Sequence, residues 1–199
     1  MPTKPTMRTK QLQIADVVLL TPVQNTDNRG FFSETYNRKI FEELGIHANF
    51  VQDNHSSSNQ AFVLRGLHFQ KPPTDQGKLI RVTQGSILDV ALDIRQNSPT
   101  YGKHVSAILS AKNWHQLWIP SGFAHGFCTL EENTQVQYKV TNYYSRENEC
   151  GIAYNDPALS IDWNLPAGVK PVLSERDKNH RNFAQLPGYF TYQPNENKS

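Results

Sequence analysis

Alternating apolar and polar positions are the main pattern in the middle of the chain. Within residues 87–94, Leu88 and Leu92 share one face, whereas Asp89 and Asp93 share the other. A period of two residues is that of a β-strand, in which successive side chains point to opposite faces of the sheet. The pattern therefore predicts a half-buried strand over residues 87–94.

The same alternation recurs in residues 134–144, where Val136, Tyr138 and Val140 share a face. Residues 37–44 alone have a helical pattern, with Asn37 as N-cap and apolar residues at positions 40, 41 and 44. Many short strands with one or two short helices predict an all-β antiparallel sandwich or barrel, whose interior can hold one ligand. Further strand-like runs, separated by turn residues, cover residues 14–20, 31–36, 63–69, 79–83, 104–109, 116–119 and 124–130.

Composition sets limits on the class of protein. The 199 residues include 3 Trp, 8 Tyr and 10 Phe, so we expect a folded core. The formal net charge is only +2, so we expect no electrostatic field strong enough to attract nucleic acid or an anionic membrane. The polar ends predict tails at residues 1–10 and 191–199, around a single domain at 11–190. No apolar run is long enough for a membrane span or a signal peptide, which predicts a cytoplasmic protein. Cys128 and Cys150 have no metal-like spacing and are expected to be reduced thiols.

Three ionisable side chains occupy positions where the strand pattern calls for apolar residues. Lys78 shares a face with Ile80, His125 shares one with Phe127, and Tyr138 lies between two valines. Each alone has a structural explanation, such as a core tyrosine bonded to a carbonyl group. Burying several such groups costs several kcal/mol, however, unless they serve a common site. Together with the nearby His68, they predict a functional site inside the barrel.

The segment Pro-x-Gly-x-x-His at residues 120–125 resembles the second half of the cupin metal motif. The first half is degraded, because His68 is followed by Gln70 and the position of the expected Glu is best matched by Lys78. An ammonium group repels a divalent cation. We therefore expect a cupin-like pocket that holds no metal.

A metal-free pocket with His, Lys and Tyr suits proton transfer next to a ketone. The C–H proton has a pKa of roughly 20 against about 6.5 for His, a deficit of about 18 kcal/mol that stabilisation of the enolate must largely supply. A Lys ammonium can stabilise the enolate oxygen, His can remove the proton, and Tyr can return one to the opposite face. This set of residues indicates an epimerase or isomerase that needs no cofactor.

Several long strings occur in the order that a known family has them: DNRGFFSETYN (27–37), FVQDNHSSS (50–58), VLRGLHFQ (63–70), QGKLIR (76–81), LWIPSGFAHGF (117–127) and YKVTNYY (138–144). In these strings residues 11–177 closely resemble the dTDP-4-dehydrorhamnose 3,5-epimerase family. The resemblance implies a cupin-type jelly-roll barrel, a homodimer and no cofactor. It also implies a dTDP-4-keto-6-deoxy sugar as substrate: dTDP-4-dehydro-6-deoxy-D-glucose, epimerised at C3 and C5 to dTDP-4-dehydro-L-rhamnose.

The resemblance also implies a role for individual residues. His68 matches the base, Asp177 the acid that orients it, and Tyr138 the proton donor, while Lys78 fits the group that stabilises the enolate. Tyr144 matches a tyrosine that stacks on thymine. Arg176 departs from the family, which commonly has Lys there; the charge is kept but the geometry differs. The remaining substrate contacts fall on Arg29, Phe31, Glu34, Gln52, Asn54, Arg65, Lys78, His125, Glu149 and Arg176.

Strand parity leaves two points open. Arg65 and His68 are three residues apart, so a regular strand sends them to opposite faces, and a bulge is required if both line one pocket. Tyr143 and Tyr144 also alternate, so parity alone allows either to stack on a base.

Alternative functions also remain. A single epimerase acting only at C3 needs similar residues. A non-catalytic cupin that binds nucleotide sugars, and a metal-dependent cupin, are the other two candidates.

Overall fold

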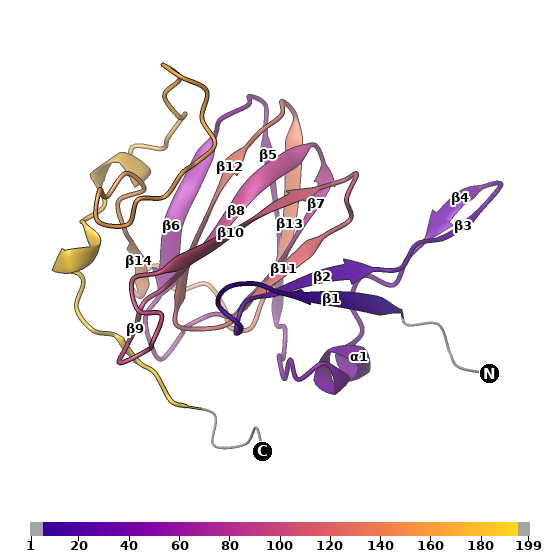
Figure 1. Cartoon of the computed structure of the whole chain (residues 1–199), viewed down its shortest axis with the longest axis horizontal. Helices are drawn as coiled ribbons and strands as arrows, with labels where there is room; N and C mark the ends of the chain where they lie inside the picture. The colour runs from indigo at the N-terminus through magenta and orange to yellow at the C-terminus, as the bar shows by residue number, and fades with distance from the viewer. Residues whose placement is uncertain (1–5, 195–199) are drawn as a thin grey trace.

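Two antiparallel sheets pack face to face (Figure 1). The computed structural model describes residues 6–194. The six-stranded sheet has the order β1 (Met7–Gln11), β2 (Val18–Pro22), β11 (Gln116–Ile119), β7 (Lys78–Gln84), β13 (Thr134–Val140), β5 (Gln52–Ser58). The five-stranded sheet has the order β10 (His104–Ser110), β8 (Ser86–Asp93), β12 (Phe123–Thr129), β6 (Leu64–Gln70), β14 (Glu149–Gly151). This arrangement confirms the predicted all-β, cupin-type jelly-roll barrel.

Smaller elements lie outside the two sheets. Strands β3 (Asn25–Asp27) and β4 (Gly30–Phe32) form a hairpin that stands away from the barrel, as Figure 1 shows. Strand β9 (Arg95–Gln96) pairs in parallel with β15 (Phe190–Thr191). The helices are α1 (Arg38–Glu43) and the short 3-10 helices η1 (Asp177–Asn179) and η2 (Phe183–Gln185). Among the described residues, no helix has the length and apolar character needed to cross a membrane.

The barrel interior is an apolar cluster contributed by both sheets. Ile80 and Val82 of β7 meet Ile87 of β8, Phe127 of β12 and Val136 of β13 there. The residues that share a face with Lys78, His125 and Tyr138 therefore point inward, as the alternation predicted. A second apolar cluster lies on the outer face of the five-stranded sheet, where the C-terminal part of the chain covers it.

Strand β8 corrects the predicted half-buried strand. All eight of its residues are buried, and Asp89 and Asp93 are completely inaccessible to solvent. Leu88 and Leu92 pack outward against Trp163 and its neighbours, whereas Asp89 shares the inward face with Ile87. Because a distant segment covers the sheet's outer face, alternation within the strand did not indicate which face meets water.

The predicted tails are partly wrong. Residues 7–10 belong to β1, which pairs antiparallel with β2, and Met7 packs beside Phe41 of α1. At the other end, Thr191 belongs to β15 and the Tyr192 N–H donates to the Gln96 carbonyl at 2.8 Å. Edge pairing uses backbone groups, so polar side chains do not prevent it. Residues 1–5 and 195–199 lie outside the described residues.

Other boundaries also differ from the predictions. The strand expected at residues 14–20 begins only at Val18, and the one expected at 31–36 is reduced to the short β4. The polar strand β5 was not predicted, because no apolar residue marks its inward face. Helix α1 has its predicted N-cap, with Asn37 Oδ1 accepting from the Lys39 N–H at 3.0 Å, but Leu44 is 38% exposed.

Candidate active site

The inward-facing ionisable residues line one cavity of about 300 Å³. Lys78 comes from β7, His125 from β12 and Tyr138 from β13, and β6 adds Arg65 and His68. A smaller cavity of about 140 Å³ shares three of these residues, His68, Lys78 and Tyr138. Between them the two cavities bring together most of the predicted site: Gln52, Asn54, Arg65, His68, Lys78, His125, Tyr138, Tyr144, Glu149, Arg176 and Asp177.

An irregularity in β6 lets Arg65 and His68 reach the same cavity. In the pairing with β12, His68 lies opposite His125 and Arg65 lies opposite Phe127, so three steps on one strand match two on the other. Gly66, inside this bulge, has a φ of 126°, a conformation that favours glycine. The bulge that parity required is therefore present.

His68 and Asp177 form a close pair across the fold. His68 Nε2 lies 2.5 Å from Asp177 Oδ1, and the Ser174 hydroxyl donates to Asp177 Oδ2 at 2.8 Å. Burial raises the pKa of Asp177, but the close contact of His180 and the hydrogen bonds of His68 and Ser174 outweigh it and hold the pKa below its ordinary value. An ionised Asp177 accepts the Nε2 proton of His68, which leaves Nδ1 with the lone pair that can take up another proton.

Lys78 is a buried cation within the cavity. Its side chain is almost inaccessible, and Nζ donates to the His68 carbonyl at 3.4 Å. Burial lowers the pKa of Lys78 to about 8, although the charges of Asp89 and Glu149 oppose the shift. The group is therefore largely charged at neutral pH, in surroundings where one charge acts strongly on a bound ligand.

Asp89 is a site residue that the sequence analysis missed. Its Oδ1 lies 2.5 Å from His125 Nε2, and its Oδ2 has no hydrogen-bond partner among residues 6–194. Burial lowers the pKa of His125, while Asp89 opposes the shift. A carboxylate within an otherwise aliphatic strand was the available signal, but the alternation was interpreted as marking a solvent face.

Tyr138 completes the set of proton carriers. Burial raises the pKa of its hydroxyl, so the proton is retained throughout the neutral range. In the sheet, Tyr138 lies opposite Asn54 of β5 and Ile80 of β7. The cavity therefore holds an imidazole paired with a carboxylate, an ammonium group and a phenol, which is a complete set for proton removal and return at a carbon next to a carbonyl group.

Tyr144 and Glu149 line the smaller cavity, and Arg176 of the larger cavity reaches the same Glu149 carboxylate. The Tyr144 hydroxyl donates to Glu149 Oε2 at 2.6 Å, and Arg176 Nη1 donates to the same oxygen at 2.5 Å. Burial raises the pKa of Glu149, but the bonds from Arg176 and Tyr144 outweigh it and lower the pKa. Tyr144, rather than Tyr143, lines the cavity and leaves 55% of its area exposed.

Three predicted contacts lie apart from this cavity within one chain. Arg29 and Phe31 lie on the β3–β4 hairpin that projects from the barrel in Figure 1, and Glu34 lies just beyond it. The Arg29 side chain is 85% exposed and pairs with Asp27, and Phe31 is 53% exposed. The structure therefore does not bring Arg29, Phe31 and Glu34 to the other site residues of the same chain.

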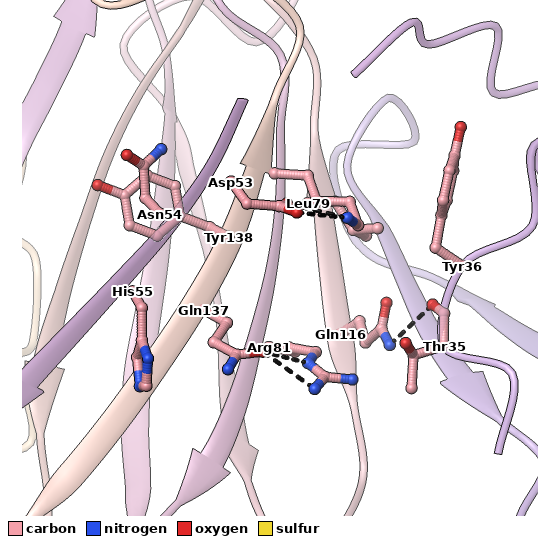
Figure 2. Close-up of a pocket in the computed structure, with 11 residues that line it drawn as sticks. Thr35, Tyr36, Asp53, Asn54, His55, Leu79, Arg81, Gln116, Gln137 and Tyr138 are labelled. Carbon is pink, nitrogen blue, oxygen red and sulfur yellow. Dashed lines mark hydrogen bonds and ion pairs between the residues drawn. The ribbon is translucent and has the colours of Figure 1, made fainter. Parts of the chain in front are cut away.

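Another cavity of about 300 Å³ lies beside the loop that follows the hairpin (Figure 2). Its polar side chains mostly bond to one another: the Arg81 guanidinium donates to Gln137 Oε1 at 3.0 and 3.2 Å, and Gln116 donates to the Thr35 carbonyl at 3.1 Å. Figure 2 shows these pairs pointing toward each other below Asn54 and Tyr138. This cavity does not contain the His68–Asp177 pair, so the other one is the candidate active site.

Comparisons with known proteins agree with the geometry. The family model of dTDP-4-dehydrorhamnose 3,5-epimerase matches residues 11–185. The dTDP-4-dehydrorhamnose 3,5-epimerase of Salmonella typhimurium is 53% identical over 165 residues, which cover 82% of this chain and 88% of that protein.

Two solved structures are also similar. The Legionella pneumophila dTDP-6-deoxy-D-glucose-3,5-epimerase, in complex with dTDP-4-keto-L-rhamnose, has a TM-score of 0.88 and 45% identity, covering 94% of this chain and 99% of that one. A 3'-monoepimerase from Streptomyces bikiniensis, in complex with dTDP-quinovose, has a TM-score of 0.80 and 27% identity, covering 87% of each chain. With the family model matching most of its length, the chain belongs to the dTDP-4-dehydrorhamnose 3,5-epimerase family.

Proposed function

We propose that this protein is a dTDP-4-dehydrorhamnose 3,5-epimerase. It converts dTDP-4-dehydro-6-deoxy-D-glucose into dTDP-4-dehydro-L-rhamnose by removing and returning protons at C3 and C5. The observation that carries the proposal is the His68–Asp177 pair, held at 2.5 Å in the same cavity as Lys78 and Tyr138. Relatives of that name, about half identical over most of the chain, support it.

The chemistry follows from the position of the ketone. C3 and C5 both adjoin C4, so one group next to the C4 oxygen stabilises the enolate formed at either carbon. Lys78 supplies that group as a buried ammonium. His68 removes the proton through Nδ1, because Nε2 is bonded to Asp177, and Asp177 stabilises the imidazolium that forms. Tyr138 then donates its proton to the opposite face of the ring.

The rest of the cavity suits a nucleotide diphosphate. Arg65 and Arg176 are planar donors that can bind phosphate oxygens, and Tyr144 offers a partly exposed aromatic face to thymine. Glu149 holds Tyr144 and Arg176 on one carboxylate oxygen, which keeps the stacking residue beside the cation. Gln52 orients the same segment, because its Oε1 accepts from the Tyr144 N–H at 3.1 Å.

Solvent exchange tests the proposed function directly. Incubation with dTDP-4-dehydro-6-deoxy-D-glucose in deuterated water is expected to place deuterium at both C3 and C5, measured by NMR and mass spectrometry of the sugar. The similar 3'-monoepimerase makes a C3-only enzyme the specific alternative. Label at C3 alone would establish that alternative, and tight binding without any label would establish a non-catalytic nucleotide-sugar-binding protein.

We further propose that two copies of the chain form a homodimer in which each hairpin serves the other copy's cavity. The hairpin of one chain presents Arg29 and Phe31 away from its own barrel, with Phe31 and Phe32 53% and 73% exposed. Exposed aromatic residues on a projecting arm are typical of a contact with another chain. Such an exchange brings the missing Arg29, Phe31 and Glu34 to a complete site.

Mixed dimers test this arrangement. A His68→Asn chain and an Arg29→Glu chain, co-expressed with different tags, are each expected to be nearly inactive as homodimers. The purified heterodimer is expected to recover about half of the wild-type activity, because one of its two sites then combines an intact His68 with the partner's intact hairpin. Absence of recovery in a verified heterodimer would place the hairpin on its own cavity.

The expectations of a cytoplasmic location and of catalysis without metal or cofactor stay predictions.

A further inference from the structure

His180 lies directly behind the His68–Asp177 pair. It follows η1, the short helix that carries Asp177, and its side chain is nine-tenths buried. His180 Nε2 lies 3.4 Å from Asp177 Oδ1, the same oxygen that pairs with His68 at 2.5 Å. The two imidazole rings meet edge to face, with their centroids 5.4 Å apart. Two histidines therefore share one carboxylate oxygen.

Gly151 makes the room for this ring. It lies in β14 directly opposite His68 of β6, and a Cβ atom built on it overlaps three atoms of the His180 imidazole. The residues that follow Gly151 and His180 also pair with each other. Ile152 forms a β-bridge with Arg181, and the Ala153 N–H donates to the Arg181 carbonyl at 2.8 Å. His180 is thus held between the strand beside the base and the helix that carries Asp177.

The only acidic group within ion-pair distance of His180 in residues 6–194 is Asp177. His180 Nε2 is buried and has no well-formed hydrogen bond to any described residue. A small rotation turns the 3.4 Å contact into a hydrogen bond, since such bonds have N–O distances of about 2.7 to 3.2 Å. As a neutral donor or as a cation, His180 interacts with the negative charge of Asp177. That interaction weakens the attraction between Asp177 and protonated His68.

We propose that His180 is a positioning residue of the epimerase, which holds Asp177 from behind and limits how strongly that carboxylate stabilises protonated His68. This inference rests on the proposed function, in which His68 is the base. His180 lines neither cavity, so it reaches a bound ligand only through Asp177 and His68. Its effect is therefore expected in kcat and in the pH dependence, with KM unchanged.

The direction of the pH effect follows from charge. Without His180, more of the Asp177 charge is available to the His68 imidazolium, so His68 is expected to hold its proton more tightly. Because the base must be neutral to act, the acid limb of the kcat/KM profile then moves to higher pH. The other charged or titratable groups near His68 stay unchanged in a His180 variant: Arg65 on β6, Lys78 on β7, His125 on β12, Tyr138 on β13, Glu149 on β14 and Arg176.

The test compares His180→Ala with His180→Gln. In His180→Ala the midpoint of the acid limb of the kcat/KM profile is expected to move to higher pH by about 0.5 to 1 unit. The plateau value of kcat is expected to fall about tenfold, with KM within twofold of wild type. His180→Gln keeps an N–H donor for Asp177 and is expected to lie between His180→Ala and the wild type. NMR titration of the His68 imidazole in the free protein checks the same shift without turnover.

Gly151→Ala provides a matched perturbation of the same contact. Its methyl group is expected to displace the His180 ring and to reproduce the His180→Ala profile, while the double variant adds no further loss because the ring is already absent. An unshifted limb with an equal loss of kcat at every pH would show a merely structural role and overturn the proposal. Failure of the proposed function is distinguishable, because the wild-type protein would then not place deuterium at both C3 and C5. Failure of the base assignment alone would appear as wild-type exchange in His68→Asn.

Discussion

Replacing His68 with Asn is expected to lower kcat by about 10³-fold and to abolish deuterium exchange at both C3 and C5. The amide cannot take up a proton, and general-base catalysis of this kind contributes roughly 10² to 10⁴. Asn matches the near part of the imidazole in size and polarity, so the fold and dTDP binding are expected to persist. Steady-state kinetics and calorimetric binding of dTDP measure the two effects separately.

His47→Asn is the matched control for this experiment. His47 is exposed in the segment after α1 and lines neither cavity, so its replacement is expected to leave kcat within twofold of wild type. If His68→Asn kept more than a tenth of the wild-type kcat, another group would have to be the base. His125 is then the next candidate, because it lies opposite His68 and pairs with Asp89 at 2.5 Å.

Replacing Lys78 with Met is expected to change activity and stability in opposite directions. Loss of the ammonium removes the group that stabilises the enolate, so kcat is expected to fall by about 10² to 10³, the usual effect of removing one such donor. Met fills a similar volume without the cost of a buried charge. Because burial lowers the pKa of Lys78 from 10.5 to about 8, the cation opposes folding. The free energy of unfolding at pH 7 is therefore expected to rise by about 3 kcal/mol at most.

Lys78 is also expected to produce a decline of kcat/KM at basic pH in the wild-type enzyme. Lys78 stabilises the enolate only while it is protonated, so kcat/KM is expected to fall as the pH rises through about 8. The stability cost of the buried cation is fully present below pH 8 and disappears as the pH rises toward 10.5, where the unfolded chain also loses the proton. Tyr138 does not account for this limb, because burial raises the pKa of its hydroxyl.

Lys78→Arg separates charge from geometry. A guanidinium keeps its charge across this range, so the residual activity of Lys78→Arg is expected to show no decline near pH 8. A decline that persists in Lys78→Arg would assign the limb to another group. If Lys78→Met were less stable than the wild type, the ion pairs and hydrogen bonds of the Lys78 ammonium would outweigh the cost of burying its charge.

The chemistry of the cavity was predictable from local patterns to a useful extent. Strand parity pointed Lys78, His125 and Tyr138 inward, and the structure places all three in one cavity. Parity also required a bulge between Arg65 and His68, which β6 contains. Side-chain direction within a strand depends only on the backbone repeat, so it can be inferred without knowing the fold.

Other features depended on segments far apart in the chain. Alternation alone assigns Asp89 to a solvent-facing side, because the pattern within β8 is the same whichever face is covered. Asp177 reaches His68 across 109 positions, and His180 joins them only because Gly151, on a third segment, has no side chain. No local periodicity records such contacts.

The class of fold and the inward direction of the proton-carrying residues could be inferred from the amino-acid sequence, and its resemblance to a known family implied a substrate. Folding determined which groups meet at a common carboxylate: Asp177 between His68 and His180, Asp89 with His125, and Glu149 between Tyr144 and Arg176. It also decided that the hairpin of Arg29 and Phe31 lies apart from its own cavity. The physical reason is one of range, since alternation reflects the backbone repeat of a single strand, whereas burial, pKa and charge sharing depend on atoms that only folding brings within a few ångströms.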